Sequence, residues 1–209
     1  MFYFAKTPFW IKKLFSSRIW DMPGRPKAIY LSFDDGPDPQ ITPFVLEELD
    51  KFNAKATFFC IGKHVIAHPG VYQCILEAGH AVGNHTYDHP DGWKTSNNDY
   101  LDNVLKAKAS IDSSLFRPPY GHITKRLSNT LLLPPYHLHT VMWSVLSGDF
   151  DESISAEKCY RNIISNTKSG SIVVFHDSKK ADIRMRYCLP LVLKHFSELG
   201  FSFEKITVK

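Results

Sequence analysis

The chain has 209 residues, of which 44% are hydrophobic and 22% charged, and its 25 basic and 21 acidic side chains give a net charge of +4. This composition is typical of one ordinary globular domain and excludes intrinsic disorder, collagen-like repeats and a coiled coil. No run of about 18 apolar residues is present, which excludes a transmembrane helix. The weak basic balance gives no indication of a nucleic-acid partner.

Residues 1–26 are predicted to form an N-terminal arm ahead of a main domain at residues 27–209. The arm has no uninterrupted apolar core of about 7–15 residues and no small-residue cleavage site, so we expect no signal peptide and a cytoplasmic location, with association with the cell envelope as the alternative. Its apolar residues could line a basic amphipathic helix that makes a peripheral membrane contact through residues 1–20. Alternatively, the arm packs on the main domain and leaves its lysines in water.

From residue 28 onward, strand patterns alternate with helix patterns. Strands are predicted at 28–33, 56–61, 81–83, 139–145, 171–175 and 201–206, with another that ends at 116–117. Helices are predicted from an N-cap at Thr42, at 69–78, at 97–113, from an N-cap at Ser155, and at 187–199. This alternation implies parallel strands with helical crossovers, in either an incomplete βα barrel or an open doubly wound sheet. Both architectures place their chemistry at the carboxyl ends of the strands.

Acid, histidine or arginine side chains follow five of these strands. They lie in the segments 32–37, 84–90, 117–121, 143–150 and 174–177. In a parallel sheet all five segments project onto one face of the molecule, and this convergence is the main indication of an active site.

Asp34 and Asp35 form an adjacent acidic pair, and such a pair needs a cation or a shared proton unless it is a solvated turn. His85 and His89 lie four residues apart in a compact loop. Two imidazoles and the carboxylate of Asp35 would leave open positions for water, as catalytic zinc sites do. Non-haem iron sites use the same ligand types, so the residues alone do not identify the metal.

Arg117 precedes two prolines and an aromatic residue, in a stiff loop from which its guanidinium can hold a carboxylate. His176 lies at the end of a buried strand, where it could serve as a general acid if Asp149 or Asp177 tunes it. No serine or cysteine nucleophile is indicated: there is no GxSxG motif, and the four cysteines are widely spaced.

Together these segments resemble the polysaccharide deacetylases, a carbohydrate-esterase family also called the NodB-homology domain. The matching motifs are Asp-Asp-Gly-Pro at 34–37, His-Thr-x-x-His-Pro at 85–90, Arg-x-Pro-Tyr at 117–120 and an apolar strand that ends in His176. The resemblance covers about residues 27–206. It implies a distorted, incomplete seven-stranded βα barrel for the main domain.

The resemblance also implies roles for the site residues. Asp35, His85 and His89 would bind a divalent metal, expected to be zinc, with cobalt, nickel, manganese or iron as alternatives. Asp34 would be the general base, oriented by Arg117, and His176 the general acid. The expected substrate-binding residues are Tyr120, whose backbone N–H would also face the oxyanion, together with Trp143 and Pro119.

The fourth motif departs from the family pattern Trp-Ser-x-Asp-x-x-Asp-Trp. Leu146 replaces the first aspartate and Phe150 the final tryptophan, whereas Asp149 is retained as the residue expected to tune His176. The implied activity is hydrolysis of N-acetyl groups on an amino-sugar glycan such as peptidoglycan or a chitin oligosaccharide. The alternatives are a deformylase or deacetylase of a lipid-linked amino sugar, another amide hydrolase of the superfamily, and a non-catalytic carbohydrate-binding protein.

Overall fold

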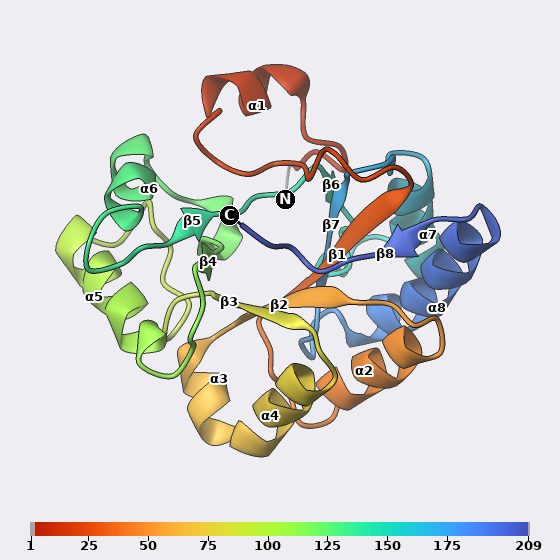
Figure 1. The fold of residues 1–209 in the computed structure, drawn as a ribbon, viewed down its shortest axis with the longest axis horizontal. Coiled ribbons are helices and arrows are strands. Elements are labelled where there is room, and N and C mark those ends of the chain that lie inside the picture. The colour runs from red at the N-terminus through yellow and green to blue at the C-terminus, as the bar shows by residue number, and fades with distance from the viewer. Residues whose placement is uncertain (1–2, 209) are drawn as a thin grey trace.

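The structure, a computed structural model, describes residues 3–208 and forms a curled half-barrel of parallel strands with helices outside it (Figure 1). Seven strands follow the order β5-β4-β3-β2-β1-β7-β6, and the short β8 pairs with β1. The strands are β1 (Ala28–Asp34), β2 (Ala56–Cys60), β3 (Ala81–Asn84), β4 (Leu115–Phe116), β5 (His139–Thr140), β6 (Val145–Leu146), β7 (Ile172–His176) and β8 (Ser202–Phe203). The predicted distorted, incomplete barrel is therefore confirmed.

The helices form an arc around the strands, and α1 crosses the opening of that arc (Figure 1). They are α1 (Phe9–Leu14), α2 (Thr42–Asp50), α3 (Gly62–Ala67), α4 (Pro69–Glu77), α5 (Asn97–Lys108), the 3-10 turn η1 (Pro119–Gly121), α6 (Lys125–Leu131), α7 (Ala156–Ile164) and α8 (Asp182–Glu198). No helix within residues 3–208 is both long and apolar enough to cross a bilayer.

Side-chain caps explain several helix starts. The hydroxyls of Ser96, Thr124 and Ser155 each accept a hydrogen bond from a backbone N–H in the first turn of α5, α6 and α7, as N-caps do. The predicted cap at Thr42 is wrong, because Thr42 is the first residue of α2 and Ile41 precedes it without a side-chain cap. The Thr42 hydroxyl instead donates to Asp177.

The predicted strand at 139–145 is also wrong, because it divides into β5 and β6. Its middle turns toward the N-terminal arm, where Met142 N–H donates to the carbonyl of Ile19 at 2.7 Å. Helices α3 and α6 were not predicted, since six or seven residues are too few to give a clear helical period. Helix α8 begins at Asp182 rather than at 187, and the last strand is shorter than predicted.

The N-terminal arm fills the gap between the two edge strands of the half-barrel. Lys6 pairs with Val145 of β6, and Ile19 pairs with Val141, which directly follows β5. Thr7 N–H donates to the carbonyl of Ser144 at 2.9 Å. These contacts satisfy backbone groups that the edges of an open sheet would otherwise leave unpaired.

The core is centred on β1, where all seven residues are buried. Phe33 stacks on Phe58 and Phe175 of the neighbouring strands, with ring centroids 5.1 and 5.7 Å apart. A parallel strand covered on both faces needs a largely apolar sequence of this kind. This packing fixes the end of β1, and hence the position of Asp34.

A buried glycine in β3 provides a test of this packing. A Cβ atom at Gly83 would lie 2.5 Å from the Phe59 ring and 3.3 Å from the Leu115 Cβ. We expect Gly83→Ala to lower the free energy of unfolding by about 1–3 kcal/mol, as overpacking does, in urea denaturation. Gly70→Ala in α4 is the control, since nothing lies within 4 Å of the added Cβ; equal losses in the two variants would contradict the packing argument.

Candidate active site

The ends of the strands surround a cavity of about 430 Å³. Its lining residues come from strand ends, from η1 and from the N-terminal arm, and they are Tyr3, Asp34, Asp35, His85, His89, Pro118, Tyr120, Gly121, His122, Trp143, Leu146, Phe150, Val174, His176 and Lys180. The parallel sheet thus brings together side chains that are distant in the sequence, such as Asp34 and His176, as expected for the carboxyl ends of parallel strands.

Asp35, His85 and His89 form a cluster suited to a metal ion. One ligand atom of each lies within 4.8 Å of the others, and the Asp35 Oδ1 atom is 3.6 and 3.2 Å from the Nε2 atoms of His85 and His89. Within residues 3–208, no donor completes a hydrogen bond to that buried Oδ1 atom. Burial raises the pKa of Asp35, but the two imidazoles outweigh this effect and hold the pKa well below its ordinary value.

Hydrogen bonds to backbone carbonyls orient His85 and Asp35. His85 Nδ1 lies 2.7 Å from the carbonyl of Arg117, an acceptor, so Nδ1 carries a proton and Nε2 is the nitrogen available to bind a cation. His64 Nδ1 lies 2.8 Å from the carbonyl of Asp35. An ionised carboxylate oxygen without a donor, facing two imidazole nitrogens, fits a divalent metal.

Asp34 belongs to a separate ion pair beside this cluster. The Arg117 Nη1 atom lies 2.7 Å from Asp34 Oδ1, and both side chains are buried. Arg117 also donates to the Ser32 hydroxyl and to two backbone carbonyls. Burial lowers the pKa of Arg117, while Asp34 opposes that shift. The guanidinium therefore fixes the Asp34 carboxylate in one orientation.

His176 lies across the cavity and is paired with Asp149. Both the Nδ1 atom and the backbone N–H of His176 lie 2.7 Å from a carboxylate oxygen of Asp149. Burial alone would lower the pKa of His176, but Asp149 raises it, with smaller contributions from Asp35 and Asp34, to about 10. The imidazole is thus held protonated at neutral pH.

Asp177, the alternative partner for His176, instead holds the turn after β1. It accepts hydrogen bonds from Gly36 N–H at 3.1 Å and from the Thr42 hydroxyl at 2.5 Å. A Cβ at Gly36 would lie 2.1 Å from an Asp177 oxygen, so only glycine fits there. Burial raises the pKa of Asp177 to about 8.

Unusual backbone conformations gather at this cavity. The non-glycine residues Asp35, Thr86, His89 and Tyr120 have φ values of 80°, 66°, 67° and 60°. Such conformations are costly and persist where the surroundings impose them, often at functional sites. Here they accompany two residues of the cation cluster and the exposed Tyr120.

Two of the three predicted sugar-binding residues line the cavity, and the third does not. Tyr120 and Trp143 line the cavity, whereas Pro119 is buried and Pro118 lines the wall instead. Leu146 lines the cavity as well, at the position where the family pattern has an aspartate. Phe150 packs its ring edge-on to His176, with 5.2 Å between centroids.

Tyr3, Lys180 and His64 also contribute to the site and were not predicted. Tyr3 lines the cavity from the N-terminal arm, and its ring lies 5.2 Å from that of Phe150. Its hydroxyl donates to Asp151. No local motif identifies Tyr3, because its place depends on the pairing of the arm with β6. His64 could have been suspected only as one histidine among ten.

Comparisons with known proteins agree with this geometry. Residues 21–136 match the family model described as "Polysaccharide deacetylase". The chain is 32% identical over 194 residues to a peptidoglycan-N-acetylglucosamine deacetylase of Bacillus cereus, covering 90% of each chain. It is 38% identical over 186 residues to the peptidoglycan-N-acetylglucosamine deacetylase PgdA of Listeria monocytogenes, covering 86% of this chain and 38% of that protein.

Among solved structures, the chain is similar to the Bc1960 peptidoglycan N-acetylglucosamine deacetylase in complex with 4-naphthalen-1-yl-N-oxidanyl-benzamide. The TM-score is 0.85 at 28% sequence identity, and the match covers 96% of this chain and 95% of that one. The similarity therefore extends over the arm as well as the half-barrel.

Proposed function

Because this chain belongs to the polysaccharide deacetylase family, we propose that it removes N-acetyl groups from an amino-sugar glycan, with peptidoglycan or a chitin oligosaccharide as the substrate class. It is a hydrolase of carbon–nitrogen bonds other than peptide bonds. The observation that supports the proposal is that one cavity holds the possible metal ligands Asp35, His85 and His89. The same cavity is lined by members of the buried Asp34–Arg117 pair and the His176–Asp149 pair. These are the parts that an amide hydrolysis by activated water requires.

Asp35, His85 and His89 would hold the metal ion, and we propose zinc, because two imidazoles and one carboxylate are a common catalytic zinc set. Cobalt, nickel, manganese or iron are the alternatives to be tested by metal content. When bound, the ion supplies a Lewis acid that polarises the acetyl carbonyl and makes a water molecule acidic near neutral pH.

Asp34 is the proposed general base. Its carboxylate is oriented by Arg117 Nη1 at 2.7 Å and lies next in sequence to the cation ligand Asp35. The guanidinium, itself fully buried, keeps Asp34 from rotating toward solvent. Asp34 thereby accepts the proton of the attacking water at a fixed position, and positioning of this kind contributes much of the rate.

His176 is the proposed general acid. It is protonated because of Asp149, and it donates its proton to the departing amine as the carbon–nitrogen bond breaks. The products are acetate and a free amino sugar. The backbone N–H of Tyr120, in a left-handed conformation at the cavity wall, is proposed to face the oxyanion that forms during the attack.

Tyr3 and Phe150 are proposed to form an aromatic wall for a sugar ring. We expect Tyr3→Ala to raise KM several-fold with little change in kcat, because its ring packs on Phe150, which is not one of the proposed catalytic groups. Tyr3→Phe, which keeps the ring and loses the bond to Asp151, separates stacking from that bond. The control is Tyr187→Ala, which removes another partly exposed tyrosine, on α8. A fall in kcat with an unchanged KM for Tyr3→Ala would contradict the proposed role of Tyr3 in binding a sugar ring.

Release of acetate from acetylated chitin oligosaccharides and peptidoglycan fragments tests the proposal. Activity is expected to be lost on chelation and restored by a divalent metal. Undiminished acetate release from metal-free protein would overturn the mechanism.

A second candidate is deformylation or deacetylation of a lipid-linked amino sugar. A groove of about 320 Å³ shares Tyr3, Tyr120 and Trp143 with the cavity and is otherwise largely apolar, with Ile11, Phe15, Trp20 and Met142 among its lining residues. An acyl chain fits such a lining. Formate or acetate release from a lipid-linked amino sugar, but not from its soluble headgroup, would favour this candidate.

A further inference from the structure

The short helix α1 exposes an apolar face. Phe9, Trp10 and Leu14 are 78%, 62% and 62% exposed, and none of the six residues of α1 is buried. At 100° per residue, Phe9, Lys13, Trp10 and Leu14 fall within about 140° of one another on the helix. Large exposed aromatic side chains gathered on one face usually mark a contact surface.

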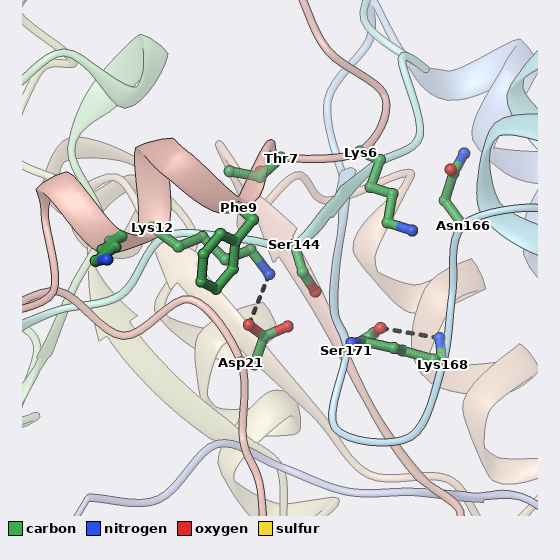
Figure 2. Close-up of a pocket in the computed structure, with 10 residues that line it drawn as sticks. Lys6, Thr7, Phe9, Lys12, Asp21, Ser144, Asn166, Lys168 and Ser171 are labelled. Atoms are coloured by element: carbon green, nitrogen blue, oxygen red, sulfur yellow. Dashed lines mark hydrogen bonds and ion pairs between the residues drawn. The ribbon is translucent and has the colours of Figure 1, made fainter.

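Lysines lie within and beside this apolar face. A hollow of about 560 Å³ beside α1 is lined by Lys6, Lys12, Lys13 and Lys168, with Asp21 as the one acidic side chain among its lining residues (Figure 2). Lys12 is paired with Asp21 at 2.6 Å. For Lys6, Lys13 and Lys168, no acidic partner occurs within residues 3–208. The hollow therefore carries an uncompensated positive charge.

This surface belongs to the body of the protein. Thr7 N–H donates to the carbonyl of Ser144, and Leu146 N–H donates to the carbonyl of Ala5, each at 2.9 Å. After the helix, Ile19 N–H donates to Thr140 at 2.9 Å. Since both ends of the arm are bonded to the half-barrel, α1 presents Phe9 and Trp10 at a defined position.

We propose that this surface, formed by Lys6, Phe9, Trp10, Lys13, Leu14 and Lys168, docks on an anionic lipid bilayer. Aromatic rings enter the headgroup region while lysines remain beside the lipid phosphates. Three apolar side chains on a short helix give weak binding alone, and the lysines supply the second contribution that stable attachment needs. A second copy of the chain fits poorly, because it would oppose lysines to lysines.

The docking surface adjoins the largely apolar groove of about 320 Å³. Ile11 on the other side of the same helix, and Phe15 directly after the helix, line the groove that shares Tyr120 and Trp143 with the catalytic cavity. Docking through Phe9 and Trp10 therefore places the groove next to the bilayer.

Co-sedimentation of the full chain with vesicles tests the proposal. We expect binding to vesicles of phosphatidylcholine with phosphatidylglycerol, little binding to pure phosphatidylcholine, and release by salt. Lys6→Glu/Lys13→Glu is expected to weaken binding at least about tenfold, since each lysine near an anionic surface contributes substantially. Phe9→Ala/Trp10→Ala is expected to weaken it to a similar degree, and activity on a soluble substrate is expected to remain in both variants.

The control variants make similar changes of charge and of apolar area on helices that lie away from α1. Lys158→Glu/Lys194→Glu and Ile183→Ala/Tyr187→Ala change exposed side chains of α7 and α8 and should alter vesicle binding by less than about twofold. Absent binding, equal binding to both kinds of vesicle, or equal losses in the controls would overturn the proposal. The proposal would also be overturned if the protein bound insoluble peptidoglycan through this surface and did not bind anionic vesicles.

Discussion

Asp34→Asn is expected to lower kcat by about 10²–10⁴-fold, the usual contribution of a general base. The amide keeps the shape of the side chain, and its oxygen still accepts a hydrogen bond from Arg117. It cannot take up a proton from water. Arg117 retains its bonds to Ser32 and to two backbone carbonyls, so its position is kept. Single-turnover acetate release measures the loss, and thermal unfolding checks that the variant is folded.

The neighbouring Asp35→Asn is the matched comparison, because it makes the same substitution one residue along the chain. Asp35 belongs to the cation cluster, whereas Asp34 is bonded to Arg117. We therefore expect Asp35→Asn to lose bound metal as well as activity, and Asp34→Asn to keep its metal content. If Asp34→Asn left the measured activity intact, that activity would not come from this site. Equal loss of metal in both variants would contradict the separate roles of Asp34 as general base and Asp35 as metal ligand.

The sequence predicted the parts of this protein that depend on local pattern. The run from Ala28 to Phe33 is apolar except at Ser32, and it forms the central strand β1 with Asp34 and Asp35 at its end. Likewise, the motif from His85 to His89 forms a compact loop after β3 that brings both imidazoles to Asp35. The carboxyl ends of parallel strands lie at one edge of the sheet. Polar residues that directly follow a strand are therefore expected at that edge, where the site lies.

Contacts between distant segments could not be predicted in this way. Val141 to Val145 has the residues of a strand, yet its backbone leaves β5 and pairs with an arm more than 100 positions earlier. The same pairing brings Tyr3 to Phe150, which follows Asp149. The choice between Asp149 and Asp177 as the partner of His176 also depended on the structure, because both are acidic and lie close to strand ends. In the structure the Gly36 N–H and the Thr42 hydroxyl engage Asp177, and Asp149 is the residue that pairs with His176.

The pairing of His176 with Asp149 leads to the second large effect. We expect Asp149→Asn to lower kcat by about 10²–10⁴-fold at pH 8–9 and by much less at pH 6. With the carboxylate present, the pKa of His176 is raised to about 10, so the imidazolium persists across this range. Without the negative charge, burial remains and lowers the pKa of His176. The proton needed by the leaving amine is then lost at a lower pH.

The pH profile distinguishes this role from a purely structural one. A group with a raised pKa is fully charged below its ordinary pKa and loses its proton as the pH rises through the raised value. The alkaline limb of kcat should therefore move to lower pH in Asp149→Asn, and the acid limb should stay in place. Asp182→Asn, which removes an acidic side chain paired with Arg186 on α8, should move neither limb. A uniform loss at every pH would mean that Asp149 only supports the loop that carries Phe150, and that His176 obtains its proton by another route.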